Sequence, residues 1–117
     1  MFEESFVTYS NEAKMKYLSV PKIVFDQFGA VSNECAHEMV KGLHKETKAD
    51  VCLSATGIAG PTGGTEEKPV GLVHFGLYHN GEIKTYKRVF NGNRKMIRNR
   101  AMIYGLNAIR MELLKSK

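Results

Sequence analysis

The chain has 117 residues, of which 43% are hydrophobic and 25% are charged, a balance typical of one soluble globular domain with a single core. No apolar run approaches the length that crosses a bilayer, and the acidic start MFEESFVTYS lacks the basic and then apolar layout of a signal peptide. We therefore expect one domain over residues 1–117, no membrane partner and a cytoplasmic location.

The net charge of +5 leaves two classes of partner open, a nucleic acid and a small anion. Lysines are scattered through the first half of the chain, as on solvated helix faces. The only dense basic cluster consists of Arg94, Lys95, Arg98 and Arg100. A cluster of this size does not establish nucleic-acid binding, so a nucleic acid is the less favoured partner.

The chain is predicted to start with a strand and two helices. Residues 5–9 (SFVTY) alternate and are rich in strand-forming side chains. A helix should follow, capped by Ser10 or Asn11 and extending to Val20. A second, short helix is expected over 21–28, because proline suits its first position and the glycine that follows can close it.

A third helix and a buried strand come next. Ser32 is the predicted helix cap, and apolar residues at three- and four-residue spacing form the inner face of the helix: Cys35, Ala36, Met39, Val40 and Leu43. The nearly continuous apolar run 51–55 is typical of a central strand buried on both sides. A glycine-rich stretch, residues 56–71, leaves from its carboxyl end.

The last part of the chain predicts a hairpin and a long helix. Asn80-Gly81 between the β-rich runs 70–78 and 82–90 is the strongest short-range hairpin signal, so these two strands should be antiparallel. The final helix is expected over 94–115, with an inner face of Ile97, Ala101, Tyr104, Ala108 and Met111. The element order describes an α/β fold, a mixed sheet covered by helices.

The stretch TGIAGPTGGTEEKPVG, residues 56–71, has the position of a binding loop, since open α/β sheets bind ligands beyond the carboxyl ends of their strands. Its glycines allow backbone N–H groups to approach an anion, and Thr56, Thr62 and Thr65 add hydroxyl donors. Neither GxxxxGK[ST] nor GxGxxG occurs. From the residues alone, a structural loop and an anion-binding loop remain equally open.

Two further groups of residues suggest chemistry. Arg94 and Arg98 lie one turn apart at the start of the last helix, where the helix dipole disfavours cations, so a bound anion would explain them; ordinary surface arginines are the alternative. In TYSNEAK, residues 8–14, Tyr9 ends a strand and Lys14 lies on the first helical turn. A desolvated lysine there can act as a general base, although by chemistry alone a surface lysine is the favoured interpretation.

The histidines do not form a metal-binding pattern. His37 and His44 are seven residues apart, too far for joint ligation within one helical turn, and His74 and His79 fall in a predicted strand and a predicted turn. The two cysteines have neither a CxxC spacing nor a nearby Cys or His partner, and are expected to be small buried apolar side chains. The sequence therefore predicts no metal.

Four segments, in this order, resemble the C-terminal domain of the CinA family of competence/damage-inducible proteins: VTYSNEAKMKYL, GAVSNECAHEMVKG, ATGIAGPTGGTEEKPVGLVHFGL and GNRKMIRNRAMIYGLNAI. The resemblance implies a three-layer α/β/α fold with a mixed, mainly parallel sheet that includes an antiparallel hairpin. It also implies a nicotinamide-nucleotide amidase of NAD recycling, which hydrolyses nicotinamide mononucleotide to nicotinic acid mononucleotide and ammonia without a metal or cofactor.

The resemblance implies a serine nucleophile activated by a lysine, a chemistry in which the neutral amine removes the hydroxyl proton. Carried over to this sequence, the base is Lys14, with Tyr9 beside it, and Thr56 contributes to the active-site hydrogen bonds. The implied binding residues for the nucleotide are Gly57, Gly60, Gly63, Gly64, Thr65, Arg94 and Arg98.

The sequence departs from the family at the nucleophile. The family's serine lies in an ESCTGG motif upstream of YSNEAK, and this sequence contains no ESCTGG. Ser5 is too close to Tyr9 and lacks the CTGG that follows, so it is not accepted as a replacement. A smaller departure is Ser19, where the family usually has glycine.

Two expectations follow for this chain. It lacks the domain's N-terminal helix and strand, and as it stands it has weak or no amidase activity. The alternative is a non-catalytic nucleotide-binding or interaction module. A homodimer that covers an exposed sheet face is a further expectation.

Overall fold

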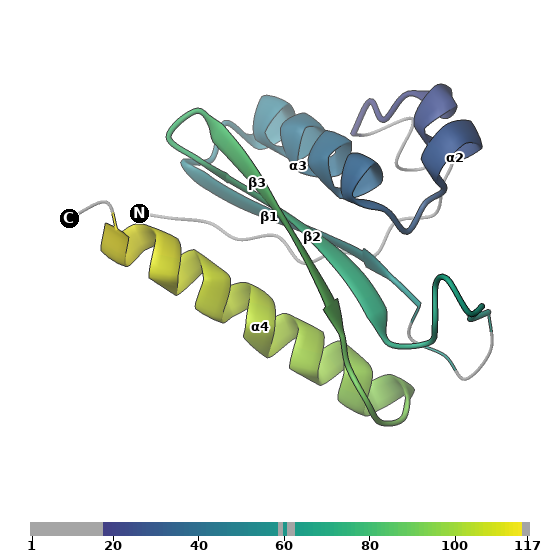
Figure 1. The fold of residues 1–117 in the computed structure, drawn as a ribbon. Coiled ribbons are helices and arrows are strands. Elements are labelled where there is room, and N and C mark those ends of the chain that lie inside the picture. The colour runs from purple at the N-terminus through teal and green to yellow at the C-terminus, as the bar shows by residue number, and fades with distance from the viewer. Residues whose placement is uncertain (1–17, 59, 61–62, 116–117) are drawn as a thin grey trace.

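The structure is a computed structural model that describes residues 18–58, 60 and 63–115 (Figure 1). Its elements follow the order α2 (Lys22–Phe28), α3 (Asn33–Thr47), β1 (Val51–Gly57), β2 (Leu72–His79), β3 (Glu82–Val89) and α4 (Arg94–Lys115). The sequence predicted all six at these places. The strand predicted over 5–9 lies outside the described residues.

The helix predicted to extend to Val20 does not include its last three residues. Leu18–Val20 are not helical, and Ser19 has φ 56°, a left-handed conformation that interrupts a helix. Pro21 then caps α2, and Gly29 ends it by donating its N–H to the carbonyl of Phe25 at 3.0 Å. The predicted end of this short helix is confirmed, and its start lies one residue later than predicted, because Pro21 is the extended N-cap and not the first helical residue.

The described strands form one sheet in the order β1-β2-β3, and both neighbouring pairs are antiparallel. Asn80 and Gly81 form the two-residue hairpin loop, with φ 51° and 78° and His79 opposite Glu82. The mainly parallel pairing is absent from these strands. A parallel neighbour needs a crossover, usually a helix, and the described residues between β1 and β2 form no helix. The strand predicted over 5–9 stays a prediction.

β1 carries side chains into both cores, as its apolar run predicted, although it lies at an edge of the described sheet. Val51 and Leu53 belong to the core on the α4 side, whereas Cys52 belongs to the core on the α3 side. Figure 1 shows α3 and α4 on opposite sides of the strands. The described part of the sheet is thus covered by helices on both faces.

α3 lies very close to β2. Ser54 Oγ on β1 donates to the carbonyl of Ala36 on α3 at 2.7 Å. A Cβ added at Gly76 on β2 would strike this same carbonyl, so only glycine fits there without displacing the helix.

The inner face of α4 differs from the predicted one. Its buried residues are Ile97, Ala101, Gly105 and Ile109, while Tyr104 and Ala108 are half-buried. Met111, predicted on the inner face, is 48% exposed. The buried positions recur every four residues, and Gly105 was missed because it carries no apolar side chain.

Candidate functional site

Thr56 lies near the carboxyl end of β1 and is only 6% exposed. Its hydroxyl donates to the carbonyl of Ala30 at 2.7 Å, in the segment that enters α3. Directly across the strand pair lies His74 of β2. Thr56 and His74 therefore present their side chains side by side, toward the beginning of α3.

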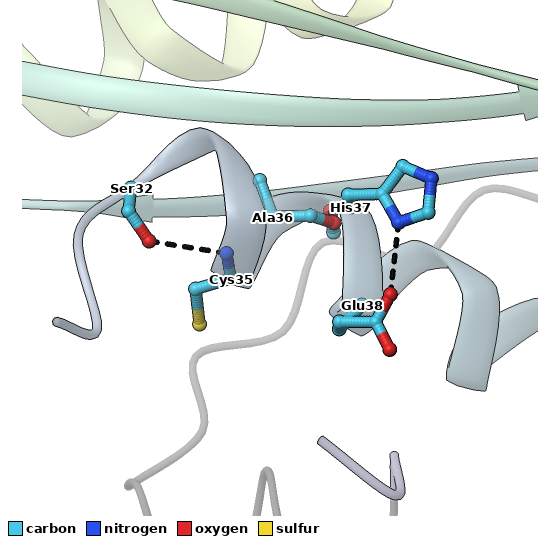
Figure 2. A network of polar contacts seen from close by, with 6 residues as sticks. Ser32, Cys35, Ala36, His37 and Glu38 are labelled. Carbon is cyan, nitrogen blue, oxygen red and sulfur yellow. Dashed lines mark hydrogen bonds and ion pairs between the residues drawn. The ribbon is translucent and has the colours of Figure 1, made fainter. Parts of the chain in front are cut away.

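The first turn of α3 is fixed by side-chain hydrogen bonds. Ser32, the predicted cap, accepts from the N–H of Cys35 at 3.1 Å, as Figure 2 shows, and donates to the carbonyl of Gly29 at 2.9 Å. One residue on, Asn33 Oδ1 lies 2.8 Å from His74 Nδ1. The beginning of α3 is thus tied to the sheet by polar side chains. Because the first turn of α3 is capped by Ser32 and bonded to His74 of β2, its position relative to Thr56 is fixed.

His74 is a site residue to which the sequence analysis gave no role. Its pKa is lowered, first by burial and then by the positive charges of Lys87 and Lys68, against a smaller opposite effect of Glu34. The imidazole is therefore held in its neutral form. The sequence contained one signal: a histidine inside the apolar run of β2 needs a hydrogen-bond partner when buried. The partner, Asn33, lies 41 residues earlier and could not be read from local pattern.

The glycine-rich loop is anchored to α4 through Arg94. Gly60 is buried and has φ 83°, and a Cβ there would lie 2.6 Å from Cγ1 of Val70. Its carbonyl accepts from Arg94 Nη1 at 3.1 Å. The sequence analysis gave Arg94 a role in anion binding, which stays a prediction; what the structure shows is the guanidinium of Arg94 against the loop.

A second anchor ties the loop to the end of α2. Thr65 N donates to the carbonyl of Lys68 at 2.8 Å, and Lys68 N donates to Thr65 Oγ1 at 3.0 Å, which forms a turn. The ammonium of Lys68 donates to the carbonyl of Phe28 at 2.8 Å. The described loop residues are thus bonded to α4 on one side and to the end of α2 on the other, and the loop has a fixed structure there.

The other predicted site residues have different outcomes. Gly57 ends β1, while Gly63, Gly64 and Thr65 are exposed at the tip of the loop. Arg98 is exposed one turn beyond Arg94 and makes no hydrogen bond or ion pair in the described part of the chain. Three residues lie outside the described ranges: Tyr9, Lys14 and Thr62. Their predicted roles stay predictions.

No three His, Cys, Asp or Glu side chains among the described residues lie together as metal ligands would. Within residues 18–58, 60 and 63–115, no helix is long and apolar enough to cross a membrane.

Helices on both faces of a sheet, and a glycine-rich loop fixed where β1 ends, define an α/β domain with a candidate ligand site at the end of a strand. Residues 1–113 match the CinA C-terminal domain. The chain therefore belongs to this family of competence/damage-inducible proteins, as the quoted motifs predicted.

Individual relatives agree with this assignment. A CinA-like protein from Kosmotoga olearia is 53% identical over 114 residues, which are 97% of this chain and 28% of that protein. The chain thus spans little more than a quarter of the length of such curated relatives.

Solved structures share the fold. The competence damage-inducible protein A (ComA) from Klebsiella pneumoniae has a TM-score of 0.87 and 33% identity, over 92% of this chain and 66% of that chain. The competence/damage inducible protein CihA from Agrobacterium tumefaciens has a TM-score of 0.85 and 38% identity, over 91% of this chain and 66% of its own.

Proposed function

We propose that this domain binds nicotinamide mononucleotide at the glycine-rich loop and belongs to an amidohydrolase that converts it, in the cytoplasm, to nicotinic acid mononucleotide and ammonia. The observation that carries the proposal is the hydrogen bond from Arg94 to Gly60. It places a guanidinium against the loop that leaves β1, the position at which α/β folds bind ligands.

The cations at this loop can serve a phosphate. A guanidinium has five N–H donors and an ammonium has three. The bond from Arg94 to Gly60 and the bond from Lys68 to Phe28 each use one of them. The remaining donors of Arg94 and Lys68 supply charge-assisted hydrogen bonds for a phosphate at the exposed Gly63 and Gly64. In this proposal Arg98 adds charge without a fixed contact.

Thr56 is the proposed contact for the reacting carboxamide. Its hydroxyl proton points to Ala30, which fixes the direction of the side chain, and the neutral His74 beside it adds no charge. The proposed base is Lys14 with Tyr9 next to it, by resemblance to the family. The nucleophile is the serine of ESCTGG, which this sequence does not contain. We therefore expect this chain to bind the nucleotide with weak or no turnover.

Ammonia release tests the enzymatic part of the proposal. This chain, and a version extended at its N-terminus by a family segment with ESCTGG, are each incubated with nicotinamide mononucleotide. We expect the extended protein to release ammonia at least a hundredfold faster, since the serine is the group that attacks the amide. Replacing the ESCTGG serine by alanine in the extended protein is the matched control and should abolish release. No ammonia from the extended protein would refute the amidase.

A non-catalytic nucleotide-binding module is the second candidate, because the contacts of Arg94 and Lys68 with the loop need no nucleophile. It shares the loop and its cations but predicts binding without turnover in both proteins. Calorimetry on the same two samples separates the candidates. Binding by the extended protein without ammonia release supports the module, whereas no binding by either protein contradicts both.

A further inference from the structure

His74 of β2 has one ring nitrogen that forms no bond within the described part of the domain. The side chain is 6% exposed, and its Nδ1 lies 2.8 Å from Asn33 Oδ1. Nε2 has no hydrogen-bond partner among the residues that the structure describes, and no fully buried polar side-chain atom among them lacks a partner. Nε2 is therefore open to solvent and to a small molecule. A nearly buried polar group with unused bonding capacity is typical of a binding position.

The contact with Asn33 makes Nε2 of His74 a hydrogen-bond acceptor. The amide oxygen of Asn33 can only accept, so Nδ1 carries the proton. The ring is neutral, because burial and the charges of Lys87 and Lys68 lower its pKa against the smaller opposite effect of Glu34. A neutral imidazole with its proton on Nδ1 has a lone pair on Nε2. The ring thus offers an acceptor without a charge.

This acceptor lies beside the proposed contact for the carboxamide. His74 is directly opposite Thr56 in the pairing of β1 with β2, and the Cβ atoms of opposed residues are about 5 Å apart, so one small planar group can contact both side chains. The positive charges of Lys68 and Lys87 act on the same position, and by charge alone they favour a carboxylate over an uncharged amide. A preference for the amide therefore requires an acceptor for its NH2 group.

We propose that His74 is a specificity-determining residue of the candidate site, and that its Nε2 accepts a hydrogen bond from the NH2 group of the ligand's carboxamide. This role rests on the proposed binding of nicotinamide mononucleotide. The carboxylate of the acid product has two oxygens that only accept, so it meets Nε2 without a proton between them. A site built to bond an N–H group rejects an analogue that lacks it, because the acceptor is then left unpaired. His74 thus favours the amide substrate and the release of the acid product.

The test is calorimetry of this chain with nicotinamide mononucleotide and with nicotinic acid mononucleotide, which differ only in the amide and acid groups. At pH 7.5 we expect the amide to bind at least tenfold more tightly. His74→Phe keeps a planar ring without an acceptor and should remove most of this preference. The matched control is His79→Phe, since the side chain of His79 on the same strand is 11% exposed and lies 3.8 Å from Glu112 of α4, on the other face of the sheet. It should leave the preference unchanged.

A pH series separates this role from a merely structural one. When His74 takes up a proton, Nε2 becomes a donor, so the preference for the amide should fall as the pH is lowered through the pKa of His74. In Asn33→Asp the new carboxylate favours the imidazolium, so the preference should be lost at a higher pH than in the wild type. Aspartate suits the first turn of α3, so this variant should fold. Because both ligands carry the same phosphate, the ratio of their affinities reports on the group at the pyridine ring.

The outcomes distinguish the role of His74 from the function on which it rests. If the wild type binds the acid as tightly as the amide, and Arg94→Gln weakens both, the nucleotide site stands and the role of His74 is overturned. A preference for the amide that His74→Phe retains, or that His74→Phe and His79→Phe reduce alike, overturns it as well. No binding of either nucleotide contradicts the proposed function itself, and the role of His74 with it.

Discussion

On the side of the sheet that faces α3, four polar side chains are buried: Ser32, Ser54, Thr56 and His74. On the side that faces α4, the core is closed by rings, with Phe75 centred 5.0 Å from Tyr104 and 6.3 Å from Phe90. Buried hydrogen bonds add little net stability but fix geometry, whereas buried aromatic rings supply much of the hydrophobic stabilisation. Both sides contain an apolar core, but only the α3 side adds buried polar side chains, and these hold the candidate site in place.

Loss of the central ring should produce the largest effect. Phe75 is fully buried, so Phe75→Ala should lower the free energy of unfolding by about 4 kcal/mol through lost apolar contact and the remaining cavity. Urea unfolding measures this value. Phe75→Leu, which keeps most of the volume, is the control and should cost much less. Equal losses for both variants would contradict a core held by the rings.

Gly76→Ala tests how close α3 lies to β2. The added methyl group meets the carbonyl of Ala36, and overpacking of this kind costs about 2 kcal/mol. Because α3 must move, nucleotide affinity should fall along with stability. Gly81→Ala is a control for the loss of glycine alone, since nothing lies within 4 Å of its added Cβ. It should strain the hairpin and leave affinity unchanged.

Arg94→Gln should act on binding and hardly on folding. The variant removes the charge against Gly60, and we expect a tenfold weaker affinity for nicotinamide mononucleotide in calorimetry, which corresponds to about 1.4 kcal/mol. Arg98→Gln should weaken binding less, because Arg98 has no contact with the described part of the loop. Arg110→Gln, at the far end of α4, should have no effect on the nucleotide. An equal loss of nucleotide affinity in all three variants would show that Arg94 acts only through the net positive charge of the domain and not through a specific contact.

Ser32→Ala removes the cap of α3. We expect a loss of about 1 kcal/mol in the free energy of unfolding, because the N–H of Cys35 loses its acceptor. Ser32→Gly should cost only a few tenths of a kcal/mol. If alanine and glycine have the same effect, the hydroxyl of Ser32 does not stabilise the helix.

The smallest effect concerns pH. The pKa of His74 in the folded chain lies below its unfolded value of 6.5, so the unfolded chain takes up a proton first as pH falls. The contribution of His74 to the free energy of unfolding is therefore fully present above pH 6.5 and is lost as the pH falls below that value. His74→Gln should lose this part of the dependence when urea unfolding is compared at pH 7.5 and 5.5. A wild type and variant with parallel pH profiles would show that His74 does not titrate in this way.

Local chemistry explains what the sequence could predict. Pro21, Gly29 and Ser32 set helix ends by their own backbone or side-chain preferences, and Asn80-Gly81 sets the hairpin. The family motifs added Arg94 to the candidate site, and the structure places it against Gly60.

The features that were missed depend on contacts distant in sequence. The antiparallel pairing of β1 with β2 depends on the route of the loop between them. The role of His74 depends on Asn33, and the inner face of α4 depends on how the helix lies over the twisted strands, so that Gly105 and Ile109 are buried and Met111 is exposed. None of these follows from residues that are neighbours in the chain.

The most direct test of the account is calorimetry of this chain with nicotinamide mononucleotide and with nicotinamide riboside, which differ only in the phosphate. If the loop and Arg94 bind the phosphate, the mononucleotide should bind at least tenfold more tightly, and Arg94→Gln should remove most of that difference. Equal affinity for the two compounds, or no binding of the mononucleotide, would contradict a nucleotide site at the glycine-rich loop.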